Sequence, residues 1–193
     1  MNWNQFYQAL DAGDVKPVYL FSGPEVHIKN EALAHMRRTL LPEGLEELNE
    51  SGREGVTAPQ IIEAAETRPV MGDRRLVVVR DWAPLMRGKA KNEAEDVEHM
   101  VEWLKRPPET CALVFYMRAD PDGKKKLTTL LRKQAECVSF DLLTDAELTR
   151  WVGQRLKPLK KRMSAAAVSQ LALTAGHELS RLSGELEKLV RSE

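Results

Sequence analysis

Apolar residues in the first 140 positions of the chain fall into short consecutive runs. Such runs are typical of parallel strands that are covered on both faces, because every side chain then meets a hydrophobic layer. Four strands are expected, at residues 18–21, 76–79, 112–116 and 138–140. A fifth and weaker strand is expected at residues 45–49.

Between these runs, apolar residues recur at the spacing of amphipathic helices. The helices are expected at residues 33–40, 57–68, 97–104 and 127–131. Thr57 and Gln60 have the pattern of a capping box at the start of one helix. Pro69 ends that helix, because a proline disfavours helical geometry in the residue before it. Trp3 and Phe6 begin a further helix that we expect to pack on the sheet.

The alternation of strands and helices predicts an α/β fold with an open, parallel five-stranded sheet. Helices are expected on both faces, since right-handed crossovers place them there. The pattern changes near residue 143, after which only helical periodicity is present. Thr144 and Glu147 form another capping-box pattern, and Gly176 stands where a later helix would end. We therefore expect two domains, an α/β domain at 1–142 and a three-helix domain at 143–193.

The composition excludes several classes of protein. The 193 residues include 29 Lys and Arg and 29 Asp and Glu, and the zero net charge argues against a strongly basic nucleic-acid binder. No apolar run approaches the roughly 20 residues of a membrane span, and the first residues lack a secretion signal, so a cytoplasmic protein is expected. Cys111 and Cys137 are interpreted as small buried hydrophobic residues, and the scattered histidines predict no metal site.

The segment FSGPEVHIKNEAL has some features of a phosphate-binding loop, whose motif is G-x-x-x-x-G-K-[ST] between a strand and a helix. Gly23 fits the first glycine and Lys29 fits the lysine. Ile28 replaces the second glycine, where a β-branched residue is strained if φ must be positive, and Asn30 replaces the hydroxyl that binds magnesium. Glu25 lies at the expected helix N-terminus, where a carboxylate would satisfy the free amides and repel a triphosphate.

The acidic half of an ATPase site is also incomplete. An ATPase of this fold needs an acidic pair directly after a core strand, to hold magnesium and orient water. The residues after the strand at 112–116 contain no adjacent acidic pair. We therefore interpret the loop as degenerate and expect no cofactor, with Gly23 in a strand-to-helix turn and Lys29 as a solvated side chain.

Five segments carry a resemblance to a known family: PVYLFSGPEVHIKNEA, AAETRPVMGDRRLVVVRD, LVFYMRADPDGKKKLTTLLRKQAECVSF, DAELTRWVGQRL and ALTAGHELSRLSGELEKL. In this order they resemble the delta subunit of the bacterial DNA polymerase III clamp loader. The resemblance implies an ATPase-like fold that has lost ATP binding, followed by a small helical lid domain. It also implies a third domain that joins the other clamp-loader subunits. That domain would begin where this chain stops at Glu193, so the chain is either a fragment or a naturally short member.

The resemblance further implies a role in DNA replication without a catalytic site. The family binds the ring-shaped sliding clamp, the beta subunit, and promotes ring opening as part of the polymerase holoenzyme. Its contact element is an apolar pair after the helix that precedes the third strand, which corresponds here to Val70 and Met71. Family members more often have a bulkier aliphatic–aromatic pair. Arg68, Asp73 and Arg74 are the nearest candidates for a wider contact surface.

The residues themselves also suit this role. Pro69 and Gly72 flank the apolar pair, which indicates a tight, projecting corner. Exposed apolar residues often mark a partner site, and methionine adapts to a preformed groove. The alternative is that both side chains fold inward under the sheet.

Two basic runs leave DNA as a candidate partner. Phosphate contacts would come from Lys124, Lys125, Lys126, Lys160 and Lys161, and the alternative is that these side chains are simply solvated. Two functions compete with the clamp-opening subunit: an active P-loop ATPase, and an ATPase-dead scaffold that binds DNA. Magnesium-dependent ATP binding would identify the first, and salt-sensitive DNA binding without the clamp would identify the second.

Overall fold

The structure is a computed structural model that describes residues 1–88, 90–175 and 178–191. The chain forms two compact units, Met1–Phe140 and Asp141–Glu193. None of the described helices is long and apolar enough to cross a membrane.

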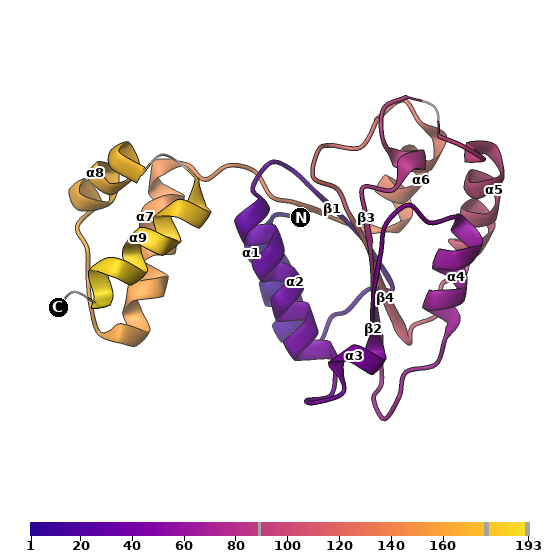
Figure 1. The fold of residues 1–193 in the computed structure, drawn as a ribbon, viewed down its shortest axis with the longest axis horizontal. Helices are drawn as coiled ribbons and strands as arrows, with labels where there is room; N and C mark the ends of the chain where they lie inside the picture. Colours follow the sequence, from indigo (N-terminus) through magenta and orange to yellow (C-terminus); the bar gives the residue numbers. More distant parts are fainter. Residues whose placement is uncertain (89, 176–177, 192–193) are drawn as a thin grey trace. The chain divides into compact units, whose positions relative to one another are not determined.

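A five-stranded parallel sheet is the centre of the first unit (Figure 1). Its strands are β1 (Val18–Ser22), β2 (Glu50–Arg53), β3 (Arg75–Arg80), β4 (Cys111–Tyr116) and β5 (Glu136–Ser139). They lie in the order β2-β3-β4-β1-β5, and every neighbouring pair is parallel. The predicted fold class is confirmed. The central strand β4 is buried at all six positions, which is why it appears in the sequence as a continuous apolar run.

Helices cover both faces of this sheet. They are α1 (Trp3–Asp11), α2 (Val26–Leu40), α3 (Glu46–Asn49), α4 (Ala58–Glu66), the 3-10 turn η1 (Ala83–Leu85), α5 (Glu93–Trp103) and α6 (Lys126–Gln134). Figure 1 shows α1 and α2 on one face and α4, α5 and α6 on the other. The predicted capping box of Thr57 and Gln60 begins α4, and Phe6 of α1 is buried on the sheet.

The two faces have different cores. On one face, Phe6 packs edge-on against Phe21 with ring centroids 5.2 Å apart, and Phe21 lies 4.9 Å from Phe140. On the other face, an aliphatic core forms around β3, β4, α4 and α5, with Trp82 stacked on Phe115. The contact between Phe21 and Phe140 links β1 to the residue that follows β5.

The weak strand expected at residues 45–49 is wrong in position. Residues 46–49 form the short helix α3, and β2 begins at Glu50. Leu45 and Leu48 are three positions apart, which is a helical spacing. The sequence of β2 itself is ESGR, which has no apolar residue because β2 is an edge strand with little burial. The hydrophobic pattern therefore gave no signal for it.

The second unit is helical over its described residues. It contains α7 (Asp145–Leu156), the 3-10 turn η2 (Lys157–Leu159), α8 (Ala165–Ala175) and α9 (Leu179–Arg191). Thr144 and Glu147 form the predicted capping box of α7. Trp151 is buried, as Trp103 is in the first unit. Gly176 lies outside the described residues.

Candidate functional site

The loop after β1 lies at the edge of the sheet where the parallel strands end. Gly23 has φ +105°, and a Cβ at this position would lie 2.5 Å from the carbonyl oxygen of Phe140. The amide of Glu25 donates to the same oxygen at 2.8 Å. Gly23 is therefore required by its close approach to the backbone after β5, as expected of a strand-to-helix turn.

Glu25 occupies the place where a phosphate would bind at the start of α2. It is the N-cap residue, its side chain is buried, and its Oε1 accepts from the amide of His27 at 3.1 Å. The protein thus provides its own anion for the helix N-terminus. A triphosphate would have to displace this carboxylate and tolerate its charge.

Lys29 is completely buried, so the prediction that it is solvated is wrong. Its Nζ donates to the carbonyl oxygens of Gly23 and Met117, both at 2.6 Å, and lies 5.0 Å from the ring centre of Tyr116. The carbonyls of two neighbouring loops point into this space and need a donor, and Lys29 supplies it. The lysine that would hold a phosphate is thus bound to the protein itself.

Burial also sets the protonation of Lys29. Desolvation lowers the pKa of its ammonium to about 8, against the opposing attraction of the Asp81, Asp120 and Glu25 carboxylates. The cation is retained at neutral pH by nearby negative charge and by two carbonyl dipoles.

The two remaining motif positions are also committed to the fold. Ile28 is buried in the core, and Asn30 Oδ1 accepts a hydrogen bond from the hydroxyl of Tyr116 at 2.8 Å. Asp81, which directly follows β3, was missed by the sequence reasoning, which examined only the residues after β4. Asp81 accepts from the amide of Arg118 at 2.8 Å and forms an ion pair with its guanidinium. The carboxylate at this edge is therefore paired with an arginine, and among the described residues no group of three His, Cys, Asp or Glu could hold a metal.

The apolar pair projects from the first unit, at the corner between α4 and β3. Val70 is 41% exposed and Met71 is 85% exposed, so the two side chains are not folded under the sheet. Met71 has φ +51°, in the left-handed region. Helix α4 ends at Glu66, two residues before the position expected from Pro69. We call residues 68–72 the corner.

Contacts from an earlier part of the chain hold the corner. The buried side chain of Asn49 accepts from the amide of Val70 at 2.6 Å and donates to the carbonyl of Val70 at 2.9 Å. A Cβ on Gly72 would lie 3.0 Å from Pro42, so this turn packs closely on the loop after α2. No sequence pattern indicated the contact between Asn49 and Val70, which lie 21 positions apart.

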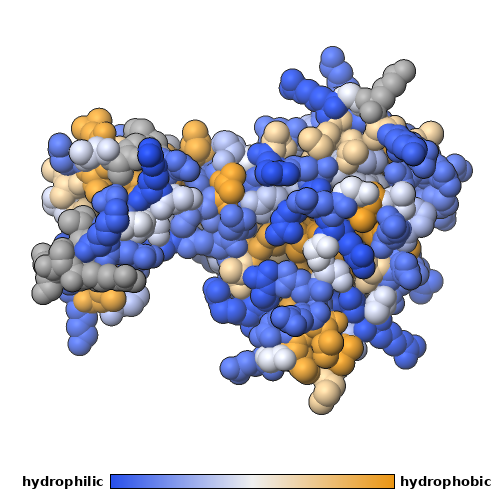
Figure 2. Space-filling model, in the orientation of Figure 1, coloured by the Kyte–Doolittle hydropathy of each residue, from blue (hydrophilic) through white to orange (hydrophobic). Residues whose placement is uncertain are grey.

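The surface around the corner combines apolar and charged groups. Leu48, the neighbour of Asn49 in α3, is 55% exposed. Figure 2 shows hydrophobic surface gathered at the end of this unit where Figure 1 draws α3. Arg68 and Asp73 are exposed, whereas Arg74 is half-buried and its Nη1 donates to the carbonyl of Val15 at 3.5 Å. Sequence reasoning missed Leu48 because it placed this residue in a strand.

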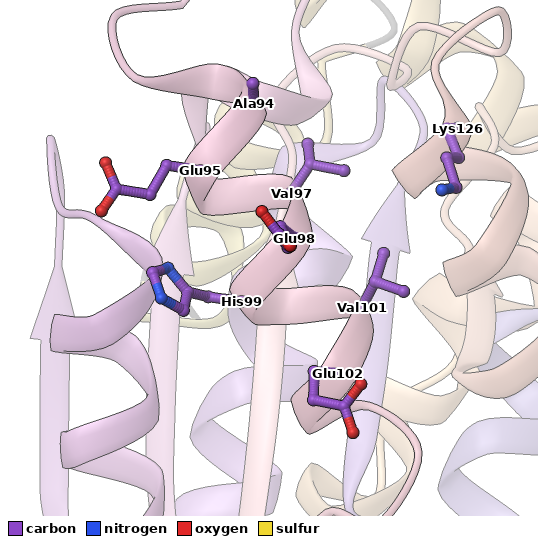
Figure 3. Close-up of a pocket in the computed structure, with 8 residues that line it drawn as sticks. All are labelled: Ala94, Glu95, Val97, Glu98, His99, Val101, Glu102 and Lys126. Carbon is purple, nitrogen blue, oxygen red and sulfur yellow. The ribbon is translucent and has the colours of Figure 1, made fainter.

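The first basic run lies among carboxylates. Lys125 Nζ is 2.8 Å from Glu93 Oε1. Lys126 borders an open pocket between α5 and α6, which is lined by Ala94, Glu95, Val97, Glu98, His99, Val101 and Glu102 (Figure 3). Acidic side chains of this kind repel DNA phosphate. The proposed phosphate contact of Lys124, Lys125 and Lys126 stays a prediction.

The second basic run belongs to the helical unit. Lys160, which follows η2, is exposed and has φ +55°, and Lys161 is half-buried. Phosphate contact by this pair also stays a prediction.

Comparisons with known proteins identify the family of this chain. A family model described as DNA polymerase III, delta subunit, matches residues 19–141. The DNA polymerase III subunit delta of Bacillus subtilis (strain 168) is 30% identical over 187 residues, which is 95% of this chain and 54% of the relative.

Two solved structures match nearly the whole chain in fold. The Bacillus subtilis DNA clamp loader delta protein (YqeN) has a TM-score of 0.80 at 28% identity, over 98% of this chain and 57% of its own. The RuvB Holliday junction branch migration motor of Thermotoga maritima has a TM-score of 0.53 at 15% identity, over 95% of this chain and 59% of its own, and shares the fold alone. The chain spans just over half the length of these Bacillus subtilis relatives. The predicted ATPase-like fold is confirmed, and the chain belongs to the DNA polymerase III delta subunit family.

Proposed function

We propose that this chain binds the sliding clamp through the corner and promotes opening of the ring, without hydrolysing ATP. The observation that carries the proposal is the display of Val70 and Met71 on a corner held by hydrogen bonds. An exposed apolar pair on a backbone that is fixed before binding suits insertion into an apolar pocket of a partner. We propose the sliding clamp as the partner because the chain belongs to the delta family, whose Bacillus subtilis member is a DNA clamp loader protein.

The magnitude of the contact requires a surface wider than two side chains. Burying one such side chain contributes about 1.5–3 kcal/mol, whereas nanomolar binding needs about 12 kcal/mol net of association costs. We propose Leu48 as a third apolar group of this surface, because it is exposed and precedes the residue that bonds Val70. Arg68 and Asp73 are exposed beside the pair and would contribute at the rim.

The absence of ATP hydrolysis is proposed from the closed state of the loop. Glu25 caps α2, Lys29 is bound to two carbonyls, and Asp81 is paired with Arg118. Each group that an ATPase would direct at nucleotide or magnesium is directed at the protein. Assembly with the other clamp-loader subunits is part of the same proposal, because the chain belongs to the delta subunit family.

The test is equilibrium binding of the chain to its cognate sliding clamp. We expect the double variant Val70→Ala, Met71→Ala to bind at least tenfold more weakly, since truncation removes about 2 kcal/mol or more of buried apolar contact. Leu173→Ala is the matched control, because Leu173 is 77% exposed in the other unit. If the double variant binds as the wild type does, or if its thermal stability falls sharply while affinity is unchanged, the corner is not the contact.

A second measurement separates the proposal from the alternative of an active ATPase. Titration with ATP and magnesium should show no saturable binding by the purified chain. Micromolar, magnesium-dependent binding would show that the side chains of Glu25 and Lys29 release their hydrogen bonds within the protein and make room for the nucleotide in solution.

A further inference from the structure

We propose that Asn49 is a positioning residue that fixes the corner in the conformation that binds the clamp. This inference rests on the proposed function, and it assigns to a buried amide in a different element the task of presenting Val70 and Met71. Asn49 itself would not touch the clamp.

The Asn49 side chain uses both its oxygen and its nitrogen to bond the backbone. Asn49 has no solvent exposure and makes three hydrogen bonds. Its Oδ1 accepts from the Val70 amide at 2.6 Å, and its Nδ2 donates to the Val70 carbonyl at 2.9 Å and to the Leu45 carbonyl at 3.1 Å. Both backbone groups of Val70 are therefore satisfied by the same amide, as a neighbouring strand would satisfy them.

Apart from these bonds and the close approach of Gly72 to Pro42, the corner is not held by regular secondary structure. Residues 67–74 form neither helix nor strand. Met71 lies in the left-handed region at φ +51°, where a non-glycine residue persists only when its surroundings determine the backbone. The bonds to Val70 act on the residue immediately before Met71 and restrict the direction in which the exposed methionine points.

Only an uncharged amide fits this position. The site needs one acceptor for an N–H and two donor hydrogens for two carbonyls, and the oxygen and the NH2 group of asparagine supply them from a single planar group. Alanine supplies neither, and an ionised aspartate supplies the acceptor alone. Loss of the amide would leave the corner to be ordered at the moment of binding, which weakens affinity without removing any contact side chain.

The first part of the test is independent of the clamp. Amide hydrogen exchange is measured at Val70 in the wild type, in Asn49→Ala and in Asn30→Ala, with the amides of β4 as the reporter of folding. We expect Asn49→Ala to accelerate exchange at Val70 at least tenfold while β4 stays protected. Asn30→Ala is the matched control, because it removes an asparagine of α2 that accepts a hydrogen bond from the Tyr116 hydroxyl rather than from Val70.

The second part is a double-mutant cycle for clamp affinity, with Asn49→Ala and the pair Val70→Ala, Met71→Ala. We expect Asn49→Ala to weaken binding at least fivefold in the wild-type background and less than twofold when the pair is already truncated, because its effect passes through the pair. If Asn49→Ala lowers the protection of β4, Asn49→Leu replaces it. Leucine has a similar size but neither accepts from nor donates to Val70, and it should show the same pattern.

The outcomes separate the two proposals. Unchanged exchange at Val70, unchanged clamp affinity of the Asn49 variants, or an equal loss of affinity in both backgrounds overturns the positioning role alone, provided that truncation of the pair weakens binding. If truncation of the pair leaves the affinity unchanged, the proposed function is wrong and the role of Asn49 in clamp binding is overturned with it.

Discussion

Replacement of Lys29 by methionine tests whether the phosphate loop is closed in solution. Methionine has a similar length and is apolar, but it has no proton to donate to the carbonyls of Gly23 and Met117. The change removes a buried cation and two hydrogen bonds together, and these effects oppose each other at neutral pH. The informative quantity is therefore the difference in unfolding free energy between wild type and variant as the pH rises.

The direction of this difference follows from the pKa of Lys29. In the folded protein burial lowers this pKa from 10.5 to about 8, so between these values the unfolded state binds more protons than the folded state. The unfolding free energy of the wild type then rises with pH in that window, and the contribution is lost as the pH falls through 8. Between pH 7 and pH 10 the expected gain relative to Lys29→Met is about 2.5 kcal/mol.

The assay is urea unfolding followed by circular dichroism, with wild type and variant compared at each pH. Burial raises the pKa of the Cys111 thiol to about 12, and it raises the pKa of Tyr19 as well, so both groups reduce stability at alkaline pH. Their effects are common to both proteins and cancel in the difference. Lys133→Met, at an exposed position of α6, controls for the loss of one lysine.

Parallel pH dependences for wild type and Lys29→Met would refute the reasoning. That result would mean that the ammonium group of Lys29 remains hydrated in the folded protein. The loop would then be open to a phosphate, and the structural argument against nucleotide binding would fail.

Three further predictions concern single residues. Gly23→Ala should lower the unfolding free energy by about 2 kcal/mol or more in urea, because its Cβ would clash with the Phe140 backbone, whereas Gly13→Ala has open space and should cost about 1 kcal/mol for its positive φ alone. Lys29→Ala should leave equilibrium clamp affinity within twofold of wild type, and a larger loss would link the closed loop to the corner. Leu48→Ala should weaken clamp binding about threefold to tenfold with little change in melting temperature, and unchanged affinity would place Leu48 outside the contact.

The hydrophobic pattern was sufficient to predict those strands in which nearly every residue is buried. The strands β3 and β4 are buried on both faces, so their residues had to be apolar at consecutive positions. The capping boxes at Thr57 and Thr144 were also readable, because both partners lie within four residues. The exposed corner followed from Pro69 and Gly72 together with the family resemblance.

The features that could not be predicted from the sequence depend mostly on contacts between distant segments. Lys29 looks like a solvated lysine until the carbonyl of Met117, 88 positions away, is brought beside it. Asn49 looks like an ordinary polar residue in the sequence, because its partner Val70 lies 21 positions further along the chain. The edge strand β2 is polar because little of it is buried, and its position was shifted as a result. Local patterns therefore located the corner but not the residues that hold it.

The most direct measurement of the central claim is the release of a sliding clamp preloaded on nicked circular DNA. The chain is added without nucleotide, and the clamp that remains on the DNA is measured with time. The account predicts faster release with the wild type and no acceleration with Val70→Ala, Met71→Ala. Release that requires ATP, or equal acceleration by wild type and double variant, would contradict it.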